Sequence, residues 1–349
     1  MPAIFTQLRL SSKNTPRHAV ARSVIVAVWL VACALLVAGC GGVQSSLDPA
    51  GREAARIANL FWWMAVGAFV VWAAVIALAL WAVRARPESH NLRRTRLLIV
   101  GGGAVVPTVV LTVLLIYGLA PIPALVAPAP EGSLKIAVTG EQWWWRVRYL
   151  PPGGEPVVLA NEIRLPVGYP VEFRLDSPDV IHSFWIPPLA GKVDMIPGRV
   201  TRLVLKPTRV GVFRGVCAEY CGASHALMAF TVVVQEREEF DRWLAHQARP
   251  AEPPVEPTPA RGQELFLANG CSACHTIRGT TAAGLIGPDL THVGSRLSLA
   301  AGTLPNEPDD FRRWVAHTTG VKPGVLMPPF HMLPPDELQA LAAYLKGLR

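Results

Sequence analysis

A short segment near the middle of the chain concentrates side chains that bind soft metal ions. It runs from Cys217 to Met228 and also holds Cys221 and His225, while His182 lies upstream at the end of a predicted strand. Thiolate, thioether and imidazole ligands together favour copper over calcium or magnesium. One cysteine would serve a mononuclear blue-copper site. Two cysteines can instead bridge two copper ions that share one mobile electron.

Zinc is the alternative metal at these positions, because two cysteines and two histidines are also a zinc ligand set. Zinc sites usually place their histidines close together, whereas His182 and His225 flank the cysteines from distant sequence. Met228 is also a poor zinc ligand. The residue types therefore favour copper. An added electron spread over two ions changes each ion's bond lengths less, which lowers the reorganisation cost of electron transfer.

A second cysteine pair lies in Gly270-Cys271-Ser272-Ala273-Cys274-His275, which contains the attachment motif for c-type haem. The two cysteines can form thioethers with the haem vinyl groups, and His275 then lies beneath the iron. A thioredoxin-like dithiol has no need of His275 and expects an adjoining βαβ pattern. The surroundings are instead predicted helices, at residues 260–268, 309–318 and 336–348.

The sixth ligand of the haem iron is expected downstream, because methionine–histidine ligation raises the potential of cytochromes c. Met327 is predicted as this ligand, since its loop is braced by prolines and loses less entropy on ordering. Met332 competes with it, and weaker candidates are His292, His317 and His331. The carbonyl of Pro288 is predicted to accept the His275 N–H and fix the ring.

Short strands are predicted to hold the metal segment in place. Turns rich in proline and glycine separate apolar runs at residues 134–139, 157–165, 171–175, 201–205, 212–216 and 230–234. About a hundred residues of this kind predict an all-β Greek-key sandwich or barrel. The proline-rich residues 248–258 favour polyproline II and span roughly 35 Å, enough for the haem domain to dock against the β domain or to swing beside it.

Composition indicates membrane spans, since 51% of the 349 residues are hydrophobic and only 17% are charged. Apolar runs at about 60–83 and 97–119 each supply the roughly 20 residues that a membrane-crossing helix needs. The arginine-rich stretch 84–96 between them predicts a cytoplasmic loop. The N-terminus and everything after residue 119 are then expected on the periplasmic side of a two-helix hairpin.

The formal net charge of +8 at pH 7 lies in segments 1–39 and 84–96, where it serves targeting and topology. Nucleic acid is therefore excluded as a partner, because such binding needs a basic patch on a folded domain. Residues 1–39 have the pattern of a signal peptide. The small residues before Cys40 match a lipoprotein cleavage box, which would leave Cys40 lipidated; an ordinary signal with an incidental Cys40 is the alternative.

At the metal segment the chain resembles subunit II of haem–copper cytochrome c oxidases. The resemblance implies a dinuclear copper centre whose ligands are the side chains of His182, Cys217, Cys221, His225 and Met228 and the backbone carbonyl of Glu219. It also implies that the Glu219 carboxylate faces a magnesium site shared with the catalytic subunit. Gln142-Trp143-Trp144-Trp145 resembles the family's aromatic segment, in which Trp143 marks electron entry and Trp144 stands where tyrosine is more usual.

The C-terminal region resembles class I cytochromes c at residues 287–290, and oxidase-fused forms at residues 301–306. We therefore expect a multidomain membrane protein with a transmembrane hairpin, a cupredoxin-like all-β Greek-key domain and an all-α cytochrome c domain. The expected boundaries are a signal peptide of lipoprotein type at 1–39, the N-terminal segment with the hairpin at 40–120, the dinuclear copper domain at 130–245, a linker at 246–258 and the cytochrome c domain at 259–349.

The resemblance implies an electron-transfer subunit in the bacterial inner membrane. Electrons would pass from cytochrome c or a membrane donor through haem c and the copper centre to catalytic subunit I, which reduces dioxygen with proton translocation. Other oxidase subunits and membrane lipid are the remaining expected partners. The alternatives are the electron-entry subunit of a nitric oxide reductase and a membrane-bound carrier without an oxidase partner. Nitrous oxide reductase would need more than the nine histidines present.

Overall fold

The computed structural model describes residues 41–84, 91–120, 122 and 127–349. Residues 43–349 form one compact unit. The predicted signal peptide and the predicted lipidation site Cys40 lie outside the described residues. Both therefore stay predictions from the sequence.

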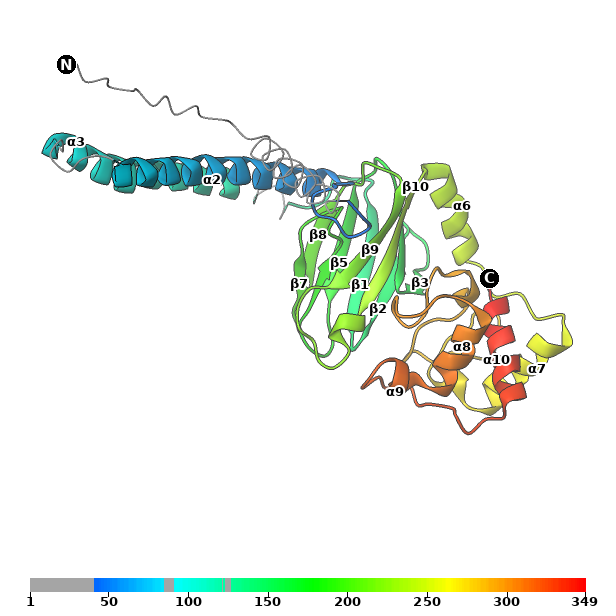
Figure 1. The fold of residues 1–349 in the computed structure, drawn as a ribbon. Coiled ribbons are helices and arrows are strands. Elements are labelled where there is room, and N and C mark those ends of the chain that lie inside the picture. The colour runs from blue at the N-terminus through cyan, green and yellow to red at the C-terminus, as the bar shows by residue number, and fades with distance from the viewer. Residues whose placement is uncertain (1–40, 85–90, 121, 123–126) are drawn as a thin grey trace, which may run out of the picture. The chain divides into compact units, whose positions relative to one another are not determined.

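Two long apolar helical segments come first in the described chain (Figure 1). The first is α2 (Arg52–Arg84), and the second joins α3 (Leu92–Arg96), the π-helical η2 (Leu97–Val105) and α4 (Val106–Leu119). Both are long and apolar enough to cross a membrane. Their apolar side chains are mostly exposed, as lipid-facing side chains would be. They confirm the two predicted apolar helices.

The strands of residues 134–235, called here the β domain, form two five-stranded sheets (Figure 1). One sheet has the order β3-β2-β1-β5-β8, with β1 (Leu134–Glu141), β2 (Trp144–Tyr149), β3 (Val157–Ala160), β5 (Val171–Asp176) and β8 (Thr201–Leu205). The other has the order β4-β10-β9-β6-β7, with β4 (Glu162–Pro166), β6 (His182–Trp185), β7 (Val193–Met195), β9 (Gly211–Cys217) and β10 (Ala229–Gln235). One hydrophobic core joins side chains of both sheets. This confirms the predicted cupredoxin-like β domain.

The apolar run at 157–165 forms two strands in different sheets, so the expected single strand is wrong. Asn161 lies between β3 and β4 with a left-handed φ of 60°. Its N–H donates to the Trp145 carbonyl at 3.0 Å, and its side-chain oxygen accepts from the Trp145 N–H at 2.8 Å. These bonds hold the point at which the chain crosses between sheets. The polar residues Asn161 and Glu162 interrupt the apolar run at the crossing, a break that the prediction of a single strand ignored.

The C-terminal part, residues 257–349, is called here the helical domain. After α6 (Arg237–Gln247) it contains α7 (Pro257–Ala268), α8 (Pro308–Ala316), α9 (Thr318–Val321) and α10 (Pro335–Gly347), with short 3₁₀ turns η4 (Cys271–Ala273) and η5 (Val293–Ser295). Its own core includes Phe266, Phe311 and Tyr344. Helices α7 and α10 approach so closely that a Cβ on Gly262 would overlap the Ala340 carbonyl. The predicted all-α domain is confirmed.

Candidate metal and haem sites

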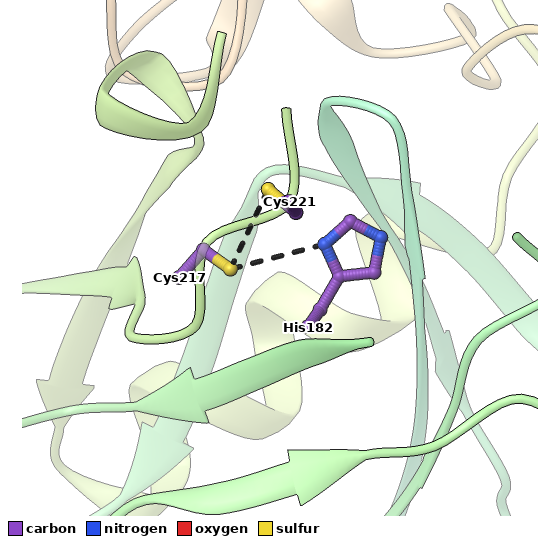
Figure 2. Close-up of side chains that lie close together, drawn as sticks. All are labelled: His182, Cys217 and Cys221. Atoms are coloured by element: carbon purple, nitrogen blue, oxygen red, sulfur yellow. Dashed lines mark hydrogen bonds between the residues drawn. The ribbon is translucent and has the colours of Figure 1, made fainter. Parts of the chain in front are cut away.

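Strand pairing brings the predicted copper ligands together from two parts of the chain. Cys217 ends β9 and His182 begins β6, and these two strands are antiparallel neighbours. In Figure 2 the side chains of His182, Cys217 and Cys221 converge. The Cys217 sulfur lies 3.8 Å from the Cys221 sulfur and 3.8 Å from His182 Nδ1. The two cysteines and His182 are buried.

The β9–β10 loop supplies the remaining predicted ligands. The Cys221 sulfur lies 3.5 Å from His225 Nδ1 and 3.8 Å from the Met228 sulfur. The Glu219 carbonyl oxygen lies 3.1 Å from the Cys217 sulfur. The 3₁₀ turn η3 (His225–Leu227) folds the loop back toward the cysteines. Every predicted copper-binding group therefore belongs to one cluster, whose sulfur and imidazole donors suit copper.

The two cysteine sulfurs have opposed electrostatic environments. Hydrogen bonding with Cys221, and then with His182, lowers the pKa of Cys217 to about 3. The neighbouring Cys217 sulfur raises the pKa of Cys221. The cluster therefore favours one thiolate beside one thiol. Because thiolates are the form that binds metal, a bound cation would draw the remaining proton away.

Polar groups behind the ligands fix their orientation. Asp179 accepts from His182 Nε2 at 2.9 Å, which leaves Nδ1 facing the sulfurs. The Trp143 indole N–H and the Gln142 side-chain amide both donate to the Cys221 carbonyl, at 2.9 and 2.7 Å. Sequence reasoning missed these roles of Asp179 and Gln142. The only signal for Asp179 is its place three residues before His182.

The predicted magnesium site gains no support. The Glu219 carboxylate belongs to a side chain that is 45% exposed, and it lies 3.8 Å from the Lys192 ammonium. Within the described residues, the one group of three or more histidine, cysteine or acidic side chains placed to share an ion is His182, Cys217 and Cys221. Magnesium at Glu219 stays a prediction from resemblance.

The haem-attachment motif opens into a mainly apolar cavity of about 580 Å³. Cys271, Cys274, His275 and Met327 all line it. His275 Nδ1 lies 2.8 Å from the Pro288 carbonyl, the hydrogen bond that the sequence predicted, so Nε2 is left for iron. Burial lowers the pKa of His275, which favours the neutral imidazole that binds metal. The residues fit a haem.

Met327 is better placed than its competitor. It lines the cavity, and its carbonyl accepts from the Thr318 hydroxyl at 2.9 Å, which holds the loop. Met332 is 67% exposed and does not line the cavity. His292 is occupied by the carbonyls of Arg249 and Arg349. The geometry supports Met327 as the sixth ligand.

Comparisons with known proteins agree with both domains. Residues 153–236 match the family model described as cytochrome c oxidase subunit II, periplasmic domain, and residues 259–349 match cytochrome c. A cytochrome c oxidase subunit 2 from Alkalihalophilus pseudofirmus is 37% identical over 225 residues, which is 64% of this chain and 64% of that protein. The subunit 2 from Bacillus subtilis is 31% identical over 229 residues, 63% of each.

Among solved structures, the periplasmic domain of subunit II of cytochrome oxidase from Bradyrhizobium japonicum is 32% identical. The match has a TM-score of 0.32 and covers 35% of this chain and 96% of that one.

A copper-type β domain joined to a cytochrome c domain and two apolar helices defines a membrane-anchored electron-transfer protein with an extracytoplasmic part. The chain belongs to the cytochrome c oxidase subunit II family and carries a C-terminal cytochrome c domain. The first domain implies a copper site and the second a haem. The chain spans about 64% of the length of its relative from Alkalihalophilus pseudofirmus.

Proposed function

We propose that this chain is the electron-entry subunit of a respiratory haem–copper oxidase. The observation that carries the proposal is that Trp143 belongs to both candidate sites. Its indole donates to the Cys221 carbonyl at 2.9 Å, and its ring lines the cavity that holds Cys271, Cys274 and His275. One buried side chain thus contacts the backbone of a proposed copper ligand and also lines the haem cavity.

The chain's own residues would hold and shield two redox groups. When bound, haem c and a pair of copper ions would each accept and release one electron at a time. Cys271 and Cys274 would attach the haem covalently, and His275 and Met327 would bind its iron. The copper pair would be bound by His182, Cys217, Glu219, Cys221, His225 and Met228. Burial of the cysteines excludes water from the metal cluster.

The proposed partner is a separate catalytic subunit that reduces dioxygen to water with proton translocation. Tyr220 is exposed on the ligand loop between Cys217 and Cys221, so this loop offers a face to that subunit. The electron donor would be cytochrome c or a membrane-bound donor. The apolar helices would lie in the bacterial inner membrane, with the N-terminus, the β domain and the helical domain in the periplasm.

The proposal is tested by purifying the complex through a tag on this chain and measuring oxygen uptake with a reduced donor. Cys221→Ser should abolish near-infrared copper absorption and oxygen uptake, because one of the two thiolate ligands is lost, while haem c stays reducible. Cys274→Ser is the reciprocal control, which should impair covalent haem attachment and keep the copper band. Retained absorption in Cys221→Ser contradicts the ligand assignment. Nitric oxide reduction without oxygen uptake would favour the nitric oxide reductase alternative.

A further inference from the structure

Lys322 of the helical domain is a buried lysine with no carboxylate partner among the described residues. Lys322 is only 2% exposed to solvent. Its ammonium forms no ion pair within the described part of the chain. Its ammonium donates to the carbonyls of Trp143 at 2.6 Å, Leu227 at 2.9 Å and Ala300 at 3.1 Å. A lysine ammonium has three N–H donors, so all of them are used. Burying an ammonium away from water costs free energy, so these three hydrogen bonds are needed to stabilise it.

The carbonyls that Lys322 binds connect it to the copper site. Trp143 and Leu227 belong to the β domain, whereas Ala300 belongs to the helical domain. The Trp143 indole bonds the carbonyl of Cys221, and Leu227 directly precedes Met228. Lys322 is therefore bonded to residues one step removed from two proposed copper ligands. Desolvation lowers the pKa of Lys322 to about 7, while the nearby Cys221 sulfur favours its charged form.

The residues after Lys322 continue the contact between the domains. The Pro323 carbonyl accepts from the Ser224 hydroxyl at 2.6 Å. Gly324 has a left-handed φ of 81°, and a Cβ there would lie 2.8 Å from the Trp143 ring. Only glycine fits between the backbone and the indole. Met327 follows on the same loop, so one short segment joins the proposed axial ligand to the β domain.

A second segment of the helical domain meets the β domain beside Lys322. Ala300 and Ala301 adopt left-handed φ values of 50° and 59°, which direct successive carbonyls to different partners. The Ala301 carbonyl accepts from the Ala229 N–H at 3.1 Å, while the Ala300 carbonyl accepts from Lys322. Nearby, the Leu297 N–H donates to the Glu162 carboxylate at 2.8 Å. Backbone groups of both domains thus pair across the contact.

The segment between α6 and α7 is also fixed to the helical domain. The Ala251 N–H donates to the Arg278 carbonyl at 2.8 Å, and the Arg278 guanidinium donates to the Gln247 carbonyl at 2.7 Å. A ring nitrogen of His292 lies 3.0 Å from the Arg249 carbonyl. These bonds hold the segment in place, which favours a docked helical domain over a swinging one.

We propose that Lys322 is a positioning residue that fixes the helical domain on the β domain, with the haem cavity held against Trp143. Two of its three hydrogen bonds, to Trp143 and Leu227, join the haem-binding loop to the backbone beside the copper ligands, and the third holds Ala300 of the same domain. The consequence of this docking, rapid electron transfer between the haem site and the copper site, rests on the proposed function. The docking itself is independent of any bound metal.

Hydrogen exchange and electron transfer in the full chain test the inference with Lys322→Met, which keeps side-chain length and removes the charge. The Ala229 and Leu297 amides should exchange about tenfold faster or more, because three charge-assisted bonds are lost. Amides elsewhere in the β9–β10 pair, away from Ala229, should keep their rates. In the loaded chain, transfer from haem to copper after photoreduction should slow by about tenfold or more, with the near-infrared band and haem potential unchanged.

Lys135→Met is the matched control, because Lys135 is an exposed lysine on β1, and it should change neither rate. If Lys322→Met does not fold, Gly324→Ala supplies the same test by forcing a Cβ against Trp143. Unchanged exchange at Ala229 and Leu297 overturns the docking role, and an unchanged transfer rate overturns the positioning role. The exchange result holds whatever metal the cysteines bind, so its failure is distinct from failure of the proposed function.

Discussion

Cys217 and Cys221 differ from ordinary buried cysteines in what surrounds them. Each sulfur faces the other at 3.8 Å and also has an imidazole nitrogen within 3.8 Å. Two such sulfurs repel when both are ionised, and the opposed shifts of their pKa values follow from that proximity. A cation placed between them removes the repulsion. The pair is therefore arranged to bind positive charge.

The prediction at the haem site concerns Met327, the proposed sixth ligand of the iron. Met327→Leu keeps the side-chain volume but removes the thioether, so the haem potential should fall, because methionine–histidine ligation raises it. Redox titration of the full chain measures the change. Met332→Leu is the matched control and should leave the potential unaltered, since Met332 is exposed outside the cavity. A lowered potential in the control alone would transfer the role to Met332.

Sequence reasoning predicted those site residues that lie close together in the chain or form a known motif. The cysteines, His225 and Met228 fall within one short segment, and the haem motif is contiguous. Lys322 gave no such signal, because its partner Trp143 lies 179 residues away in the sequence. A single lysine also belongs to no recognisable motif. Its role depends on how two domains pack, which local pattern does not encode.

At the scale of elements, strand pairing delivers His182 to the cysteines. Phe184 of β6 pairs with Cys217 of β9, which places His182 beyond the end of β9, beside the ligand loop. Gly140 of β1 provides the space, since a Cβ there would lie 3.1 Å from the His182 ring. The β strands therefore act as a rigid frame for a site that is itself mostly loop.

Asn161 tests the strand crossing. Asn161→Ala should destabilise the β domain by about 2–4 kcal/mol, because alanine is strained at positive φ and the Trp145 N–H loses its acceptor. Asn161→Gly tolerates the φ and should cost less, about 1–3 kcal/mol. Chemical denaturation of the full chain, followed by tryptophan fluorescence, gives both values. Equal stability of the alanine variant and the natural chain would show that the crossing does not depend on Asn161.

Element prediction succeeded where apolar residues are bounded by clear turns, as in β5 and β8. Strand β2 is not predicted, since Trp144 and Trp145 are interpreted only as part of the aromatic segment that follows Trp143. The alternation of this strand was present in the sequence, because the buried Trp145, Val147 and Tyr149 alternate with arginines. The helices around the haem motif were predicted well because their periodicity is local.

At the scale of the whole molecule, hydrogen bonds join the first apolar helix, α2, to the β domain. The Glu53 carboxylate, in the first turn of α2, accepts from the Lys206 N–H at 2.9 Å, and the Arg52 N–H donates to the Lys206 carbonyl at 3.0 Å. Gly51 packs against the Leu189 backbone, where no Cβ would fit. Together with the Lys322 contacts, these bonds give a continuous chain of fixed elements from α2 to the haem cavity.

Metal analysis of the purified full chain, combined with electron paramagnetic resonance, tests the central claim most directly. The account predicts two copper ions per chain and a hyperfine pattern in which one unpaired electron is shared between two equivalent nuclei. Cys217 and Cys221 would then be the bridging thiolates. One zinc ion, or a single copper with the hyperfine pattern of one nucleus, would contradict the dinuclear site and the relay that depends on it.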